Sequence, residues 1–209
     1  MKKSELSFFI TLSLAMLVPV PGRLAYGIIL ILFLNILVLT GILFKKLISF
    51  FYSGELQNVI LCALMISTCV LFRQIFLILF PLQTFILGIT IFMPVLTSFV
   101  LGRLYVNRNL SVAAELKASL KSSTGFSLFS ILFFALRDII GYGTLSFPSG
   151  MGITEIKLFD IASSEISFLG MFWASVPGAL ILIAIEILVV ASINRNLNII
   201  ESLYRRGGE

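Results

Sequence analysis

Long apolar stretches separated by short polar segments run through most of the chain. Residues 24–44 contain no charged side chain, and residues 74–102 continue without one well beyond the length of a single span. A membrane-spanning helix needs about 20 predominantly apolar residues, so we expect a turn at Pro81-Leu82-Gln83 to divide the longer stretch. The pattern predicts six membrane segments, at residues 6–20, 24–44, 58–80, 84–102, 124–147 and 166–193.

The first segment, residues 6–20, has two interpretations. Lys2 and Lys3 precede an apolar stretch of the length found in secretory signal peptides. The stretch that follows, Val18-Pro-Val-Pro-Gly-Arg23, lacks a small-x-small cleavage site, and a proline directly after the cut would disfavour cleavage. We therefore expect this segment to be retained.

The composition points to the same class of protein. Of the 209 residues, 59% are hydrophobic and only 12% are charged, and the mean hydropathy is +1.11. Soluble domains carry about 25% charged residues, so this chain lacks the polar side chains to cover a globule in water. We expect an all-α integral membrane protein with a single membrane domain, residues 1–209, in contact with the lipid bilayer. Nucleic-acid binding is not expected, because the basic residues fit loops at a membrane surface better than a soluble basic patch.

Two residue types limit the possible chemistry. The chain has no histidine, which excludes Ser-His-Asp catalysis, histidine-ligated metals and a histidine pH switch. Cys62 and Cys69 lie in one apolar stretch, about 10 Å apart along a helix, whereas a disulfide needs Cα atoms within about 7 Å. We expect both cysteines to be packing residues that do not pair with each other, and we expect no metal site.

The basic residues are distributed unevenly between the predicted loops. Arg23 and Lys157 fall in loops on one side of the membrane, and Arg73 and Arg137 fall inside segments. The other eleven fall in the tails and in the loops on the opposite side, namely Lys2, Lys3, Lys45, Lys46, Arg103, Arg108, Lys117, Lys121, Arg195, Arg205 and Arg206. Because cytoplasmic loops are enriched in Lys and Arg, both termini are predicted to be cytoplasmic.

The six segments divide into two halves of similar layout, residues 6–80 and 84–193. Three crossings in each half would give the halves opposite orientations, and the first segment of each half is short and carries a proline, Pro19 or Pro94. Short, interrupted segments at matching positions are typical of inverted repeats in transporters. Prolines are also common in membrane helices, so the pattern is equally compatible with no repeat.

Ionisable residues inside the predicted segments are candidates for an ion pathway. Arg137 and Asp138 are adjacent, so they point about 100° apart on a helix and need not pair with each other. Gly141 and Gly143 follow and are expected to end or unwind the helix beside Asp138. Glu186 lies late in the last segment, and we favour a position near the interface over a buried one.

The loop of residues 103–122 has its own periodicity. Leu110, Ala113, Leu116 and Leu120 recur at roughly helical spacing among charged residues. We expect a short cytoplasmic helix that lies on the bilayer surface.

One segment resembles a known family. Leu136-Arg-Asp-Ile-Ile-Gly-Tyr-Gly-Thr-Leu145 is similar to the Leu-Arg-Glu-x-x-Gly-x-Gly-Thr-Leu signature of the Rnf/Nqr membrane subunits, with Asp138 in place of the glutamate. Gly102-Arg103 and Pro177-Gly-Ala179 occur in the order that this family shows. The cytoplasmic termini are similar to those of the D/E-type member. The resemblance implies a bacterial cytoplasmic (inner) membrane and partner subunits that include an inverted-topology sibling, in a complex that carries flavin and iron–sulfur centres.

The resemblance also implies where a cluster ligand should stand. In the family, each of two sibling subunits supplies two cysteines, from its short broken segments, to one [2Fe–2S] cluster. The matching positions here are Ala15 and Ser98, and neither supplies the thiolate that such a cluster needs. We expect no cofactor to be bound by this chain alone and no catalytic residue in it.

Two functions follow as hypotheses. The resemblance implies a membrane subunit that couples electron transfer, between NADH or ferredoxin and quinone or NAD, to the movement of Na⁺ or H⁺. Asp138 is then the best candidate acid of the ion pathway, with Arg137, Gly141, Gly143 and Glu186 as further candidates. The alternative is a six-helix substrate-binding component of a vitamin or metabolite importer, which suits the size and topology equally but makes no use of the segment from Leu136 to Leu145.

Overall fold

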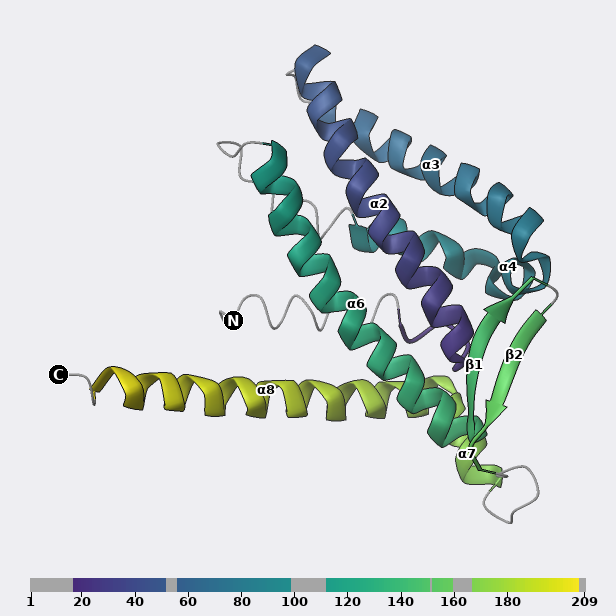
Figure 1. Cartoon of the computed structure of the whole chain (residues 1–209). Coiled ribbons are helices and arrows are strands. Elements are labelled where there is room, and N and C mark those ends of the chain that lie inside the picture. The colour runs from purple at the N-terminus through teal and green to yellow at the C-terminus, as the bar shows by residue number, and fades with distance from the viewer. Residues whose placement is uncertain (1–16, 52–55, 99–111, 151, 160–166, 207–209) are drawn as a thin grey trace.

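The computed structural model of the chain describes residues 17–51, 56–98, 112–150, 152–159 and 167–206 (Figure 1). The elements in chain order are α2 (Leu24–Phe51), α3 (Gln57–Leu79), α4 (Pro81–Leu87), the 3₁₀ helix η1 (Gly88–Phe92), α6 (Val112–Tyr142), β1 (Thr144–Ser149), β2 (Gly152–Lys157), α7 (Ser167–Ala174) and α8 (Val176–Arg206).

Within the described residues, four helical stretches are long and apolar enough to cross a membrane. They are Leu24–Phe51, Gln57–Leu79, Pro81–Ser98 and Ser119–Tyr142, and they correspond to the second to fifth predicted segments. The first segment falls mostly outside the described residues, and the apolar part of the sixth, Val176–Val189, is shorter than a full span. The chain is therefore mostly helical, with four helices suited to a membrane-embedded protein, and six crossings and an inverted repeat remain predictions.

Apolar side chains are exposed along α3, as expected of a helix that faces lipid. Contiguous exposed apolar surface of this size marks a membrane or partner contact in general. The large exposed side chains of α3 are Val59, Ile60, Ile66, Val70, Leu71, Ile75, Leu77, Ile78 and Leu79.

The core is centred on α2, and α3, α6, α8 and the segment from α4 onward contribute buried side chains to it. The helices α2 and α6 run side by side (Figure 1). Gly27 permits their close approach, because a Cβ atom there would overlap the ring of Phe134. A polar contact also joins the two helices. The amide of Asn35 donates to Oγ of Ser127 (2.8 Å) and accepts from Oγ of Ser123 (2.7 Å), which is the kind of side-chain hydrogen bond that links helices in lipid.

The break between the third and fourth segments lies at Phe80, one residue before the predicted turn. Phe80 leaves the helical conformation, and Pro81 occupies the first turn of α4, where its missing N–H and fixed φ are tolerated. The fourth segment is interrupted at Gly88, which has φ +50° and begins η1. Pro94, the residue that the sequence suggested as the site of a break, lies farther along.

Two expectations, one about the fold class and one about the loop before the fifth segment, were wrong. First, the protein is not all-α within the described residues, since β1 and β2 form an antiparallel hairpin in the register Thr144↔Lys157 to Ser149↔Gly152. The predicted segment of residues 124–147 therefore ends at Tyr142, because Gly143 has φ +68° and terminates α6. Second, α6 begins at Val112, so the later part of the expected surface helix is continuous with the span.

The helix α6 runs from one end of the molecule to the other. Figure 1 shows the hairpin, the start of α2 and the end of α6 together at one end, and the end of α2 and the start of α6 at the other. The helix α8 begins beside the hairpin end and runs away from α2 and α3 (Figure 1).

Candidate functional site: a junction of helix ends

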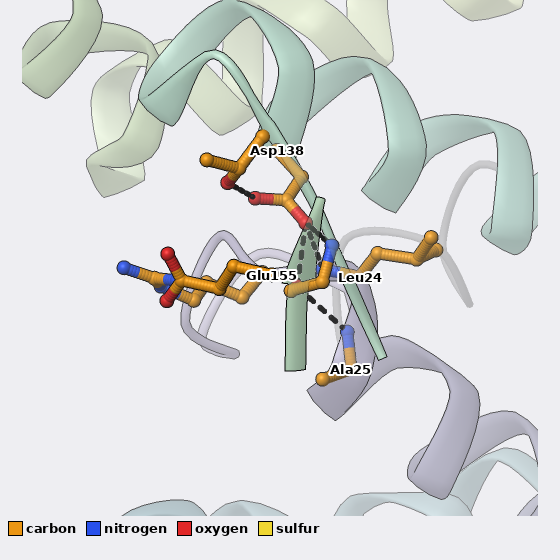
Figure 2. A network of polar contacts seen from close by, with 7 residues as sticks. Leu24, Ala25, Asp138 and Glu155 are labelled. Carbon is orange, nitrogen blue, oxygen red and sulfur yellow. Dashed lines mark hydrogen bonds and ion pairs between the residues drawn. The ribbon is translucent and has the colours of Figure 1, made fainter. Parts of the chain in front are cut away.

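Asp138 lies at the centre of a buried polar network in which its carboxylate accepts four hydrogen bonds (Figure 2). Its side chain is fully buried. Oδ2 accepts from the backbone N–H of Leu24 (3.1 Å), from the backbone N–H of Ser146 (2.7 Å) and from Oγ of Ser146 (2.5 Å). Oδ1 accepts from Oγ1 of Thr144 (3.1 Å). An ionised carboxylate surrounded by donors in this way is well stabilised without a cation.

The network caps the beginning of α2. The first amides of a helix have no acceptor within the helix, and here Asp138 accepts from Leu24 while Oγ of Ser146 accepts from the N–H of Ala25 (3.1 Å). A carboxylate is also the favourable charge at the amide end of a helix dipole. Asp138 therefore joins three elements, since α6 carries it, β1 surrounds it and α2 begins on it.

Arg137 binds the opposite kind of helix end. Its guanidinium is buried, at 1% exposure. Nη1 donates to the carbonyl of Val20 (2.7 Å), and Nη2 donates to the carbonyls of Ala174 (2.7 Å) and Ser175 (3.3 Å). Ala174 is the last residue of α7, so the cation lies at the carbonyl end of a helix, where positive charge is favoured.

Each of the two adjacent charged side chains therefore binds a different helix end: Asp138 binds the amide end of α2, and Arg137 binds the carbonyl end of α7. Among the described residues no ion pair joins Arg137 to Asp138, which is consistent with their angular separation on α6. The chain between Val20 and Leu24 passes close to both, because a Cβ atom on Gly22 would come within 2.8 Å of Nε of Arg137 and 3.0 Å of the carbonyl oxygen of Ala174. We refer to Arg137, Asp138 and the backbone groups they bind, at the start of α2, at the end of α7 and at Val20, as the junction.

Of the two glycines after Asp138, one behaves as expected and the other does not. Gly143 ends α6, and its carbonyl accepts from the N–H groups of Leu158 (2.8 Å) and Phe159 (3.0 Å). Gly141 remains helical. A Cβ atom there would lie 3.1 Å from Cβ of Ala174, so Gly141 allows α6 and α7 to approach closely rather than unwinding the helix.

Side chains outside the predicted set fasten the hairpin to the helices. Arg23 forms an ion pair with Glu155 of β2 and lies 4.5 Å from the centre of the Tyr142 ring. The amide of Gln83, on α4, donates to the carbonyls of Ser149 and Gly152 on either side of the hairpin turn. No residue spacing in the sequence predicts these contacts, because they join residues that are far apart in the chain.

Glu186 does not belong to the junction. It is buried, at 6% exposure, whereas the sequence favoured an interfacial position. Neither of its carboxylate oxygens has a hydrogen-bond partner in the part of the chain that the structure describes. From Ser175 of the junction, Glu186 is displaced by roughly 16 Å along the helix, from the rise per residue. The structure thus brings together four of the candidate residues, Arg137, Asp138, Gly141 and Gly143, and separates the fifth.

The candidate cluster positions and the cysteines lie elsewhere. Ala15 is outside the described residues, and the buried hydroxyl of Ser98 donates to the carbonyl of Val95 (2.8 Å). Cys62 and Cys69 are both free, as predicted, and the thiol of Cys69 points to the carbonyl of Ile91 (3.6 Å). Within the described ranges no group of three Cys, Asp or Glu side chains could hold a metal ion.

The fold and the junction describe a mostly helical protein with apolar helices of membrane-spanning length and a charged pair that binds helix ends. No protein-family model matches the chain, and no curated protein matches it in sequence. The resemblance to the Rnf/Nqr membrane subunits therefore rests on the sequence motifs, chiefly the segment from Leu136 to Leu145.

Proposed function

We propose that the chain is a membrane subunit of an Rnf/Nqr-type complex that couples electron transfer to the movement of Na⁺ or H⁺, without cluster ligands of its own. The observation that carries the proposal is the place of the motif in the fold. Arg137 and Asp138, the charged residues of the motif, bind the carbonyl end of α7 and the amide end of α2. In many transporters, the ends of discontinuous helices form the binding sites for ions and substrates.

In this proposal Asp138 acts as a positioning residue. All four of its hydrogen-bond donors are N–H or O–H groups of this chain: Oδ2 accepts three of these hydrogen bonds, and Oδ1 accepts one, from Thr144. A cation bound by both carboxylate oxygens would have to displace Leu24 or Ser146 from Oδ2. The junction would then act in ion movement by opening and closing the contact between α2, β1 and α6.

The proposed orientation has both termini in the cytoplasm and the hairpin on the opposite side. It is supported by the arrangement in Figure 1, where the end of α2 and the start of α6 lie at the same end of the molecule. These two ends carry Lys45, Lys46, Lys117 and Lys121, which the positive-inside rule assigns to the cytoplasm.

The proposal is tested by purifying the tagged full chain from its native membrane and identifying what is bound to it. We expect an inverted-topology six-helix subunit and a flavin-carrying subunit, and we expect vesicles of the complex to take up Na⁺ or H⁺ when NADH or reduced ferredoxin is oxidised. Co-purification with an ATP-binding transport subunit would refute the proposal in favour of an importer. A [2Fe–2S] electron paramagnetic resonance signal that is lost when Cys62 and Cys69 are both replaced by alanine would contradict the absence of cluster ligands.

A further inference from the structure

Glu186 is a carboxylic acid on an apolar helix face. Ala179, Leu182 and Ile183 precede it on α8 at helical spacing and are 0%, 6% and 2% exposed, so all four side chains belong to the buried stripe of the helix. Glu186 itself is 6% exposed. Its carboxyl group therefore lies where the helix packs inward and not on the face that α8 presents to lipid or to another subunit.

Nothing in the described part of the chain compensates a negative charge at this position. Both carboxylate oxygens are buried and without a hydrogen-bond partner. An ionised carboxylate in such surroundings is strongly disfavoured, whereas the protonated acid is tolerated. Asp138 provides the contrast within the same molecule, since it is also buried but accepts four hydrogen bonds.

The charged groups on the elements that pack against α8 are engaged elsewhere or distant. The guanidinium of Arg137 binds the carbonyls of Val20, Ala174 and Ser175, and Asp138 is held by its own donors. Lys117 and Lys121 on α6 are exposed, and neither donates to Glu186, whose oxygens have no partner among the described residues. On α8 itself, Arg195 is exposed and lies about 14 Å from Glu186 along the helix, from the rise per residue.

We propose that Glu186 is a proton-binding site in the interior of this protein, a carboxyl group that holds a proton and exchanges it. The ligand is a proton and not a metal cation, because hard cations require several oxygen ligands and within the described residues Glu186 belongs to no group of three or more acidic or cysteine side chains that could hold a metal ion. The inference stands on α8 alone and goes beyond the proposed electron-transfer function, which could fail without affecting it.

The protonation state is tested by infrared spectroscopy of the purified full chain in lipid vesicles at neutral pH. We expect a carbonyl stretching band of a protonated carboxylic acid that shifts in D₂O and is lost in Glu186→Gln, a substitution that has the shape of the neutral acid. Glu155→Gln, at the exposed ion pair of β2, is the matched control and should leave the band unchanged. Superimposable spectra of wild type and Glu186→Gln would overturn the proposal.

Proton exchange is tested on the same vesicles with dicyclohexylcarbodiimide, which adds to protonated carboxyl groups in apolar surroundings and leaves a stable N-acylurea. Mass spectrometry should find the adduct on Glu186 and not on Asp138, with labelling that decreases at least tenfold as the pH is raised. Protection by Na⁺ at constant pH would overturn the proton assignment in favour of a cation site. An infrared band that does not shift in D₂O, together with an unlabelled Glu186, would show that the proton is trapped and would overturn the exchange.

Discussion

Arg137 and Asp138 show how two charges can be accommodated in an apolar molecule without pairing with each other. Each is compensated by backbone dipoles. The carboxylate of Asp138 accepts from the amide of Leu24, and the guanidinium of Arg137 donates to the carbonyl of Ala174. Backbone groups at helix ends are unsatisfied within their own helix, so each contact satisfies the charge and the helix end together. The cost of burying a charge is thereby offset locally.

Replacement of Asp138 by asparagine tests whether the junction needs a charged carboxylate or only a polar side chain. Asp138→Asn replaces one accepting oxygen by an NH₂ group among N–H and O–H donors, so we expect the free energy of unfolding to fall by about 3 kcal/mol, the cost of losing charge-assisted hydrogen bonds and leaving buried donors unpaired. Thermal or denaturant unfolding of the purified chain in detergent measures the change.

The matched control is Glu155→Gln, which removes one charge from a partly exposed pair and should cost less than about 1 kcal/mol. Equal stability of the Asp138 and Glu155 variants would contradict the capping role. If the junction takes part in ion movement, Asp138→Asn should also lower coupled ion uptake at equal levels of assembled protein.

For single residues, the sequence points to the unusual charged side chains more readily than to the groups that they bind. Arg137 and Asp138 are conspicuous because charges are rare in apolar segments. Their partners at Val20, Ala174 and Leu24 are backbone groups, which carry no residue signature. Glu186 was misplaced for a related reason. Its position late in an apolar stretch suggests an interface, but burial is decided by which face of α8 packs inward, and hydropathy does not report that.

Among the elements, the long helices were predicted well and the hairpin was not. Apolar stretches of span length give α2, α3 and most of α6 almost directly. The residues of β1 continue the apolar stretch of α6 after one glycine, and a short apolar run does not distinguish strand from helix. The hairpin becomes necessary only in three dimensions, where β1 supplies the Thr144 and Ser146 hydroxyls to Asp138.

Two glycines of α6 provide an element-scale test of close packing. Gly141→Ala keeps a helical conformation but places a Cβ atom 3.1 Å from Cβ of Ala174, so we expect α7 to be displaced and the free energy of unfolding to fall by about 1–2 kcal/mol. Gly125, on the same helix, has open space around it, with nothing within 4 Å of the point where a Cβ atom would lie. Gly125→Ala should therefore stabilise the protein by roughly 0.5–1 kcal/mol through helix propensity.

The opposite signs of these two changes are measured by unfolding in detergent. The double variant Gly141→Ala/Ala174→Gly should recover part of the loss, since it removes the methyl group that the new Cβ meets. A Gly141→Ala variant that is as stable as Gly125→Ala would show that the contact between α6 and α7 is loose, and that the glycine is needed for something other than space.

For the whole molecule, the distribution of charge predicts a topology, and the arrangement of the helices is compatible with it. The basic residues assign the tails and two loops to the cytoplasm. In Figure 1 the start of α6 and the hairpin lie at opposite ends of the molecule, as they must if the span of Ser119–Tyr142 crosses the membrane.

Cysteine accessibility tests this topology directly. In a background with Cys62→Ala and Cys69→Ala, single cysteines are introduced by Thr154→Cys in β2 and Lys121→Cys in α6, both at exposed positions. A membrane-impermeant maleimide added to intact spheroplasts should label the Thr154→Cys protein and not the Lys121→Cys protein, and permeabilisation should make both reactive. Labelling of both from outside would show that α6 does not cross the membrane. Labelling of Lys121→Cys alone would invert the orientation and contradict the cytoplasmic termini, while leaving the crossing itself intact.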